Sequence, residues 1–282
     1  MAQEFGTETQ SQSAQRMYNT RASNYEESWH PGYSQRFMAL VPLSAGHRVL
    51  DLCCGTGLEA FIAAEAVGEQ GEIVGVDVSA GMLEQLRERQ EREPKLGQRI
   101  RTFHHDVTDL GGVPGLEKGS FDAILCSCAF VLFECPAEVV AHWKEYLKPG
   151  GLVAIDVTHE WNLRSGLVLE QVAKRLGVKY PSNRSWIKSI ESFKKILEEE
   201  GLVVEKAVPL ERVSGQGSVF YGVDEVDKQY EYTMNSSLTQ NALFESFKVQ
   251  AKPLFREEWE KIAVDGKVES VDTSYVYVAR RP

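Results

Sequence analysis

Two hydrophobic patterns alternate along the chain from about residue 48 onward. Short apolar runs with little polar interruption, such as residues 49–52 and 73–78, are typical of strands buried on both faces of a parallel sheet. Between such runs lie longer stretches in which apolar residues recur every three or four positions, as in amphipathic helices. Strands that alternate with helices favour an α/β, doubly wound, mostly parallel sheet.

The pattern predicts seven strands and several helices. Strands are expected at residues 47–53, 71–78, 99–107, 121–130, 151–158, 202–210 and 273–281. Helices are expected at residues 58–67, 80–92, 137–147 and 186–201, each closed by a glycine, a proline or both nearby. This arrangement predicts one domain over residues 16–282 with a Rossmann-like, seven-stranded sheet.

Some segments do not fit this minimal layout. Residues 1–15 are polar and read as a flexible arm. Residues 16–45 precede the first strand, and residues 159–185 and 211–272 interrupt the later strands. The last two are rich in aromatic residues and too long for ordinary loops, so we expect helical cover over the carboxyl edge of the sheet.

Charge and composition exclude several classes of partner. The 282 residues carry a formal net charge of -10, which repels a phosphate backbone and argues against nucleic acid. No apolar run is long enough to span a bilayer, and the amino-terminal residues do not resemble a secretion signal. The odd count of five cysteines favours free thiols in a reducing compartment. We therefore expect a cytoplasmic protein, a monomer or weak homodimer, that acts on a small molecule without a metal.

The stretch RVLDLCCGTGLEAF, residues 48–61, contains a glycine turn between a strand and a helix. It meets the relaxed dinucleotide pattern, and Asp77 ends the next strand as a ribose-binding acid would. However, Asp51 lies four residues before Gly55, where a carboxylate would oppose a pyrophosphate. An acid at this place suits a ligand that carries an ammonium or another cation.

Four motifs in order strengthen this interpretation: VLDLCCGTG, GVDVSAGML, HHDVTDL and LKPGGLVAIDV. Together they resemble the class I S-adenosylmethionine-dependent methyltransferases over roughly residues 48–157. The preceding YNTRASNYEESW resembles the branch that contains ubiquinone- and menaquinone-biosynthesis and other small-molecule methyltransferases. The resemblance implies S-adenosyl-L-methionine as cofactor and S-adenosyl-L-homocysteine as product.

The resemblance also implies roles for particular residues. Asp51 would lie near the methionine end of the cofactor, Gly55 and Gly57 would allow close backbone approach, and Asp77 would accept from the ribose hydroxyls. The other implied cofactor-binding residues are Thr56 in the turn, Val78 and Met82 around the adenine, Asp106 and Val107 at its far side, Cys126 through its carbonyl, and Tyr18 and Tyr25 in the amino-terminal segment.

Several of these implied roles leave alternatives open. Asp77 could merely cap the following helix, and Tyr18 and Tyr25 could be packing aromatic residues. The family commonly has glycine where this chain has Cys53, and a side chain there narrows the approach to the cofactor. Asp106 could be a turn residue only, because aspartate is a frequent turn former.

The acceptor is less well defined by the sequence. The aromatic inserts predict a largely apolar acceptor, with Phe130, Phe133 and Trp161 as candidate contacts, and His159 is a weak candidate base. The sequence as a whole, aromatic inserts included, resembles fungal natural-product methyltransferases, among them those that methylate both thiols of a reduced epidithiodiketopiperazine such as dithiol gliotoxin. O- or C-methylation of a polyketide or quinone, and a non-catalytic cofactor-binding protein, stay open as alternatives.

Overall fold

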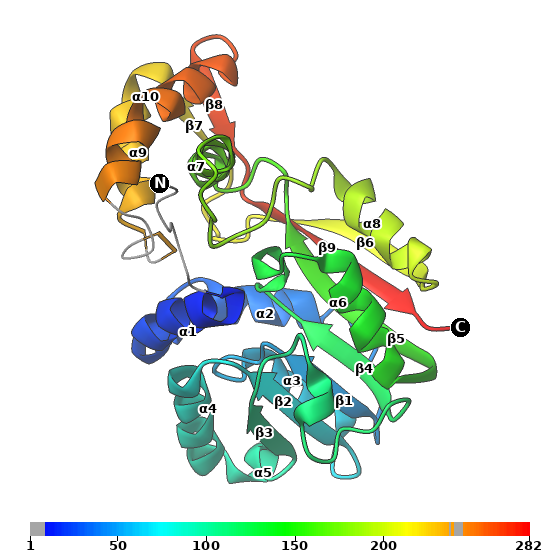
Figure 1. Cartoon of the computed structure of the whole chain (residues 1–282). Helices are drawn as coiled ribbons and strands as arrows, with labels where there is room; N and C mark the ends of the chain where they lie inside the picture. The colour runs from blue at the N-terminus through cyan, green and yellow to red at the C-terminus, as the bar shows by residue number, and fades with distance from the viewer. Residues whose placement is uncertain (1–8, 237, 240–244) are drawn as a thin grey trace.

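A seven-stranded sheet forms the centre of the molecule, as the hydrophobic pattern predicts (Figure 1). The computed structural model describes residues 9–236, 238–239 and 245–282. The strand order is β3-β2-β1-β4-β5-β9-β6. The bounds are β1 Arg48–Leu52, β2 Glu72–Asp77, β3 Ile100–His104, β4 Phe121–Cys126, β5 Leu147–Thr158, β6 Val203–Glu211 and β9 Thr273–Arg280.

The first five strands of the sheet are parallel, and β9 is antiparallel to both of its neighbours. Because the strand order reverses at β1 and β4, the loops that follow these two strands leave the sheet at its topological switch point. Ligands of doubly wound sheets bind in the crevice at this place.

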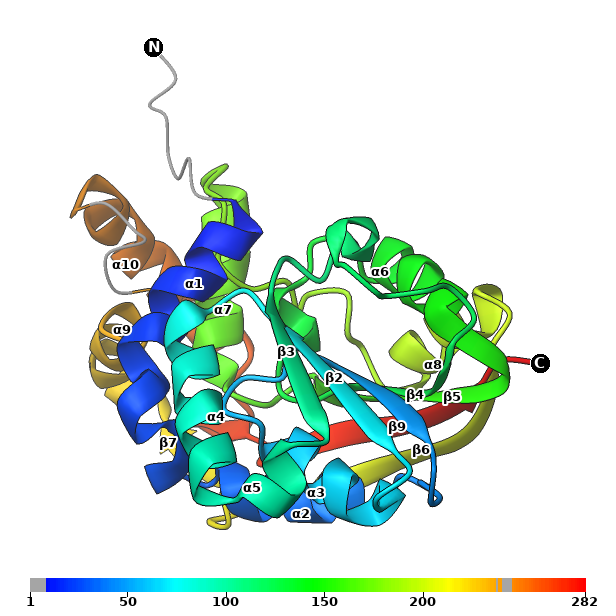
Figure 2. The same cartoon turned by 90° about the horizontal axis from the view of Figure 1, so that it is seen from below.

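Helices cover both faces of the sheet, as Figure 2 shows from a second direction. On one face, α2 (His30–Met38), α3 (Leu58–Val67) and α4 (Ala80–Arg92) contribute to a buried cluster with β1 and β2. On the other face, α6 (Pro136–Trp143) and α8 (Ile190–Glu199) pack with β4 and β5. Short helical turns complete these layers: α5 Pro94–Gly97, η2 Leu110–Gly112, η3 Phe130–Leu132 and η4 Lys144–Tyr146.

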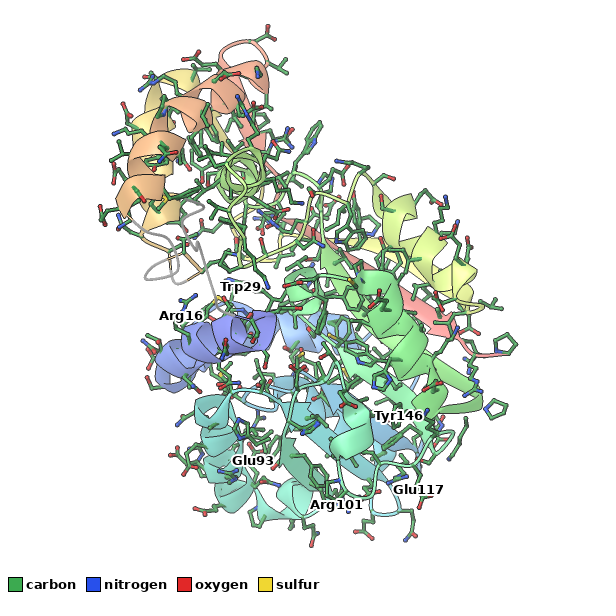
Figure 3. All side chains as sticks on the ribbon, in the orientation of Figure 1. Arg16, Trp29, Glu93, Arg101, Glu117 and Tyr146 are labelled. Carbon is green, nitrogen blue, oxygen red and sulfur yellow. The ribbon has the colours of Figure 1, made fainter. Side chains whose placement is uncertain are left out.

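The amino-terminal segment forms helices that we call the N-terminal cover, residues 10–38. It comprises α1 (Gln10–Arg21), η1 (Ala22–Glu27) and α2. The expectation of a flexible arm over residues 1–15 is wrong for residues 10–15, because Thr9 caps α1 with a capping box closed by Gln12. Residues 1–8 of that arm lie outside the described residues. In Figure 3, the labelled Trp29 lies on the N-terminal cover, between the sheet and the helices above it.

The two later inserts form a separate lobe that we call the cap. It contains α7 (Arg164–Arg175), α9 (Val226–Met234) after the turn η5 (Val223–Glu225), and α10 (Glu245–Lys261), around a buried cluster of their own. The expectation of purely helical cover needs correction, because β7 (Val219–Gly222) and β8 (Lys267–Ser270) pair as an antiparallel ribbon. Within the described ranges, no helix combines the length and the apolar character needed to cross a bilayer.

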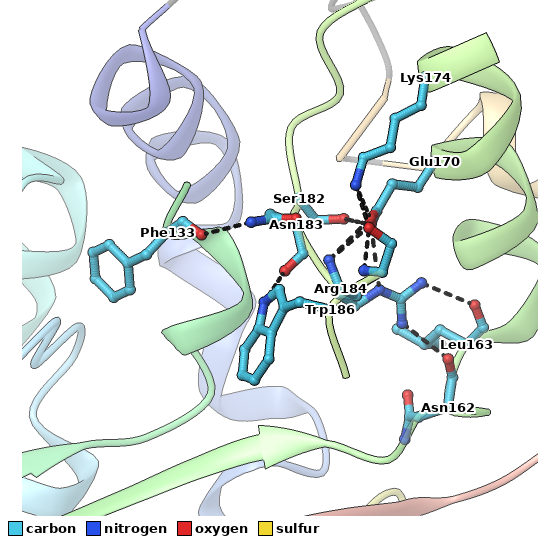
Figure 4. A network of polar contacts seen from close by, with 10 residues as sticks. Phe133, Asn162, Leu163, Glu170, Lys174, Ser182, Asn183, Arg184 and Trp186 are labelled. Atoms are coloured by element: carbon cyan, nitrogen blue, oxygen red, sulfur yellow. Dashed lines mark hydrogen bonds and ion pairs between the residues drawn. The ribbon is translucent and has the colours of Figure 1, made fainter. Parts of the chain in front are cut away.

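A buried acid holds the segment after α7 in place, as Figure 4 shows. Glu170 is fully buried and accepts hydrogen bonds from the backbone N–H groups of Arg184 at 3.0 Å and Ser185 at 2.9 Å. The Arg184 guanidinium in turn donates to the carbonyl oxygens of Asn162 and Leu163 at 2.9 and 3.2 Å. This network joins residues 182–185 to α7 and to the start of the insert that follows β5.

Candidate functional site

The turn between β1 and α3 requires glycine at two positions. Gly55 and Gly57 have φ angles of 54° and 85°, in the left-handed region that side chains rarely adopt. A Cβ at residue 57 would lie 2.9 Å from Cγ of Leu86. Cys53 also has a positive φ of 59°, so the residue that departs from the family pattern adopts a backbone conformation typical of glycine.

Asp77 connects the glycine turn to the start of α4. Its carboxylate accepts from the backbone N–H of Gly55 at 2.9 Å and from that of Ser79 at 2.8 Å. The hydroxyl of Ser79 caps α4 by accepting from the N–H of Met82. Asp77 is therefore not the cap of α4. Each of its carboxylate oxygens accepts one backbone hydrogen bond and keeps a second lone pair that a ligand could use.

Three buried carboxylates surround the glycine turn. Asp51, Glu59 and Asp77 are all at most 8% exposed. Burial raises the pKa of each one, and for Asp51 the neighbouring Glu59 and Asp77 carboxylates raise it further. A bound cation would oppose this effect, because an opposite charge within a few ångströms favours the ionised form.

Two buried polar atoms at the turn lack hydrogen-bond partners among the described residues: Oδ2 of Asp51 and Oγ1 of Thr56. Buried polar atoms in native proteins are nearly always paired with protein, water or ligand. The turn therefore combines a glycine cradle, unsatisfied oxygens and negative charge, which suits a ligand with a cationic group.

A cavity of about 270 Å³ opens at this place. Its lining comes from the glycine turn, the loop after β4 and the N-terminal cover. The lining residues are Tyr25, His30, Ser34, Cys53, Cys54, Gly55, Thr56, Leu58, Glu59, Ser127 and Cys128. The cavity brings Tyr25, Cys53, Gly55 and Thr56 together, as the sequence predicts for the cofactor's neighbourhood.

The two tyrosines of the N-terminal cover lie close to each other and to this site. The rings of Tyr18 and Tyr25 are 6.3 Å apart, and the guanidinium of Arg21 lies within 5.8 Å of both ring centres. Burial is the main reason that the pKa of Tyr18 is raised, and Arg21 partly counteracts it. The thiol of Cys53 and the carboxylate of Asp77 also contribute to the shift, so Tyr18 lies near the sites expected to hold the cofactor.

The residues expected around the adenine follow β2 and β3. Val78 is half-buried at the tip of β2, and Met82 is buried in the first turn of α4. Asp106 accepts from the N–H and the hydroxyl of Thr108 at 2.9 and 2.7 Å, so it does form a turn. The buried Val107 packs in the core, and its carbonyl accepts from the Trp143 indole at 2.9 Å.

Cys126 ends β4 and is fully buried. The nearby Cys53 thiol adds to the effect of burial in raising the pKa of Cys126. All five cysteines are free thiols in the structure.

The structure also reveals a contact that sequence reasoning missed. Asp156 in β5 is 4% exposed and accepts from the Tyr33 hydroxyl at 2.5 Å and the Cys128 N–H at 2.6 Å. Burial raises its pKa to about 6. Cys128 has a φ of 56°, so Asp156 holds a strained loop of the cavity wall against the N-terminal cover. The sequence feature that could have indicated this contact is the single acid within the apolar run of residues 151–158.

The expected acceptor contacts need correction. Phe130 and Phe133 are 1% and 5% exposed and pack against each other and against Trp143. They are core residues, so they offer little surface to an acceptor. Trp161 is 43% exposed, with the Arg164 guanidinium 5.2 Å from its ring centre.

His159 lies outside the residues that line the described cavity. Its Nδ1 accepts from the backbone N–H of Trp161 at 3.0 Å, and its ring centre is 5.1 Å from that of Tyr275. Burial lowers the pKa of His159. These contacts describe a packed histidine at the end of β5.

A second hollow of about 430 Å³ lies where the N-terminal cover meets the segment after α7. Its lining residues are Thr9, Gln10, Ser13, Leu132, Glu134, Lys179, Tyr180, Pro181, Ser182 and Asn183. Several of them are continuous with the residues that Glu170 holds in place.

Comparison with known proteins agrees with this geometry. Residues 49–151 match a family model described as a methyltransferase domain. The demethylmenaquinone methyltransferase of Staphylococcus aureus strain MRSA252 is 32% identical over 126 residues, 44% of this chain and 48% of the relative. The enzyme of the same name from Lactococcus lactis is 29% identical over 163 residues, 54% of this chain and 62% of the relative. The chain thus spans about half to three fifths of the length of these relatives.

Solved structures share the fold at low sequence identity. A putative methyltransferase from Bacillus halodurans superposes with a TM-score of 0.59 at 18% identity, over 88% of this chain and 98% of that one. Geranyl diphosphate C-methyltransferase from Streptomyces coelicolor, solved with S-adenosyl-L-homocysteine, has a TM-score of 0.53 at 18% identity, with 89% and 79% covered. A (4+2)-cyclase, SpnF, has a TM-score of 0.54 at 17% identity, with 89% and 80% covered.

The seven-stranded sheet has the Rossmann-like fold of the solved methyltransferases, and residues 49–151, which contain the glycine turn, match the methyltransferase-domain model. This stretch is similar to S-adenosylmethionine-dependent methyltransferases, and the relatives that it matches include two demethylmenaquinone methyltransferases. S-adenosyl-L-methionine is the cofactor of this class and S-adenosyl-L-homocysteine its product.

Proposed function

We propose that this protein transfers a methyl group from S-adenosyl-L-methionine to a small, largely apolar acceptor. One observation carries the proposal: three buried carboxylates, including Asp51 with an unpartnered oxygen, surround a glycine turn that fits a cationic ligand. The sulfonium and ammonium groups of S-adenosyl-L-methionine supply that positive charge. Its other end carries a ribose, whose hydroxyls we expect the carboxylate of Asp77 to accept from.

The cofactor supplies an electrophilic methyl group on a positively charged sulfur. The chain itself has to align the acceptor with that methyl group and keep water out. Gly55 and Gly57 permit the close approach, Asp77 orients the ribose, and Tyr18 and Tyr25 bring the N-terminal cover over the site. The Asp156 contacts to Tyr33 and Cys128 fix the opposite wall, which limits the positions that an acceptor can take.

We propose further that the methylated atom is a thiol sulfur, in a reduced epidithiodiketopiperazine such as dithiol gliotoxin. The aromatic inserts and their resemblance to fungal natural-product methyltransferases support this acceptor. A thiol is also a strong nucleophile with a pKa near neutrality. Two successive transfers would give a bis-thioether that can no longer close to a disulfide.

A quinone acceptor is the second candidate, because both curated relatives are demethylmenaquinone methyltransferases by name. The similarity to SpnF keeps a third reading open, since a (4+2)-cyclase shares this fold. In that reading the protein binds the cofactor without turning it over.

Isothermal titration with S-adenosyl-L-methionine, S-adenosyl-L-homocysteine and NADH tests the cofactor assignment. We expect wild type to bind the first two and not NADH. Asp77→Ala should weaken binding roughly 10- to 100-fold, because a charged hydrogen-bond acceptor contributes about 1.5–3 kcal/mol. Glu117→Ala, at an exposed surface acid labelled in Figure 3, is the matched control and should bind as wild type does.

Turnover then separates the three functions. Release of S-adenosyl-L-homocysteine is measured with a dithiol acceptor, a demethylated quinone and no acceptor. Turnover with the dithiol supports thiol methylation, and turnover with the quinone alone favours the second candidate. Cofactor binding with no turnover on either would favour the non-catalytic reading. NADH binding would overturn the whole assignment.

A further inference from the structure

His30 lies at the start of α2 and lines the cavity beside the glycine turn. Its ring is stacked between two aromatic side chains, with centroid distances of 3.8 Å to Trp29 and 4.1 Å to Tyr25. The interplanar angles are 20° and 30°, so the two neighbours fix the plane of the imidazole. The side chain is held rigidly at the cavity wall.

The hydrogen bonds around His30 define which ring nitrogen carries the proton. The Ser28 hydroxyl donates to the carbonyl oxygen of Tyr25 at 2.6 Å. The same hydroxyl oxygen lies 2.5 Å from Nδ1 of His30. Because a hydroxyl has one proton and a carbonyl can only accept, Nδ1–H of His30 has to donate to Ser28. The neutral ring therefore presents Nε2 as a lone-pair acceptor.

The surroundings also keep this imidazole uncharged. Burial, together with the nearby Arg21 guanidinium, lowers the pKa of His30 to about 3. A neutral ring does not repel a sulfonium cofactor, and its Nε2 lone pair stays available throughout the neutral range. In the described residues, no hydrogen bond to Nε2 competes for that lone pair.

We propose that Nε2 of His30 is the proton acceptor for the methyl acceptor in this cavity, which makes His30 a catalytic residue that sequence reasoning missed. The inference rests on the proposed function. A lone pair on the acceptor sulfur forms the new bond to the methyl carbon, and the bond from that carbon to the cofactor sulfur breaks, leaving its electron pair on a thioether. The proton of the acceptor S–H passes to Nε2 and is later released to water.

The order of these events follows from acidity. A free thiol is a weaker acid than an imidazolium ion, so Nε2 does not remove the proton beforehand. Once the sulfur has begun to bond the methyl group, its proton becomes far more acidic, and a positioned lone pair can take it. Nε2 thus lets the protonated thiol react directly, without prior ionisation.

The other titratable groups that face His30 or line its cavity are Arg21, Tyr25, Cys53, Cys54, Glu59 and Cys128. Burial raises the pKa of Tyr25, Cys54 and Cys128 well above their usual values. The pKa of His30 lies well below the range 6–9, so a difference in pH profile between wild type and a His30 variant in this range should follow the ionisation of the acceptor thiol.

His30→Gln keeps a polar side chain but cannot take up a proton. With a dithiol acceptor, we expect kcat to fall about 100-fold at pH 6.5, the low end for loss of a general base. The loss should shrink as pH rises toward about 8.5, where the thiol ionises on its own. Ser28→Ala removes the partner of Nδ1 and so allows the other tautomer of His30. We expect a smaller decrease in kcat in this variant, with the same dependence on pH.

Three readouts separate a chemical role from a structural one. In His30→Gln, the affinity for S-adenosyl-L-methionine and the melting temperature should stay close to those of wild type. The control variant is His47→Gln, which changes a histidine ahead of β1 and should keep the wild-type pH profile. An equal loss at every pH, or no loss, would overturn the role of His30. If wild type binds the cofactor but methylates no thiol, the proposed function fails at its acceptor, and the role of His30 fails with it.

Discussion

At the scale of single residues, Gly57 shows how space and backbone conformation combine. Its φ of 85° disfavours any side chain, and an added Cβ would also meet Leu86 at 2.9 Å. Gly46 has a similar φ of 80°, but nothing lies within 4 Å of its hypothetical Cβ. The two glycines therefore share the conformational effect and differ in packing.

This pair gives a prediction about stability. Gly46→Ala should cost about 1–2 kcal/mol for the left-handed backbone alone. Gly57→Ala should cost roughly a further 1–3 kcal/mol, because Leu86 has to move within a packed core. Urea unfolding of both variants measures the difference. Equal losses would mean that Leu86 yields freely and that only the backbone conformation matters.

At the scale of elements, Glu170 connects α7 to the segment that follows it. The carboxylate is fully buried and accepts from Ser182, Arg184 and Ser185. Asn183, which lies within this segment, lines the second hollow. Glu170 thus helps to hold this wall of the hollow, together with the hydrogen bonds that Asn183 donates to the carbonyl oxygens of Val131 and Glu134.

Removal of this acid should destabilise the cap. We expect Glu170→Ala to cost about 3–5 kcal/mol, because it leaves buried N–H groups and the Arg184 charge without a partner. The matched control is Glu257→Ala on α10, whose ion pairs with Arg175 and Lys261 are exposed. That variant should leave the urea midpoint unchanged. A midpoint for Glu170→Ala equal to that of the control would contradict the anchoring role.

The elements differ in how far the sequence predicts them. The helices at 58–67 and 80–92 agree with the structure at both ends, since their apolar period and nearby glycine or proline act locally. The ribbon of β7 and β8 was missed, because each strand has four residues and its partner lies more than forty residues away.

The parts of the candidate site also differ in how far the sequence predicts them. The turn at Gly55 and the acid at Asp77 follow from motifs that are contiguous in sequence. The contacts of Asp156 with Tyr33 and of Glu59 with Ser34 join distant elements, so no local pattern indicates them. The proton position on His30 depends on a hydroxyl orientation that only the structure supplies.

At the scale of the whole molecule, the cofactor cavity and the cap are built from different cores. The described cavity is lined by the glycine turn, the loop after β4 and the N-terminal cover, with no residue from α7, α9 or α10. The cap has its own buried cluster, with Trp259 fully buried and stacked 5.8 Å from Phe255. Binding of cofactor and of acceptor should therefore respond differently to damage in the cap.

Trp259→Ala tests this separation. The substitution should destabilise the cap by about 3–5 kcal/mol, as expected for a large buried aromatic residue. We expect the KM for the acceptor to rise severalfold while affinity for S-adenosyl-L-methionine stays within about twofold, a change of less than 0.5 kcal/mol. Titration calorimetry and steady-state kinetics measure the two effects, with the exposed Val249→Ala on α10 as control. A parallel loss of cofactor affinity would show that the two regions act as one unit.

The place of β9 has a consequence for how the protein is made. Residues 273–280 lie between β5 and β6, so the strand translated after all the others occupies an interior position of the sheet. The half of the sheet around β1–β4 can assemble while the ribosome is still working, because chains fold from the amino end as they emerge. The open edge of β5 and the whole of β6 have to wait for residues 273–280. A nascent chain stalled before residue 273 would therefore expose the open edge of β5 and the unpaired strand β6, which is the form that chaperones and aggregation compete for.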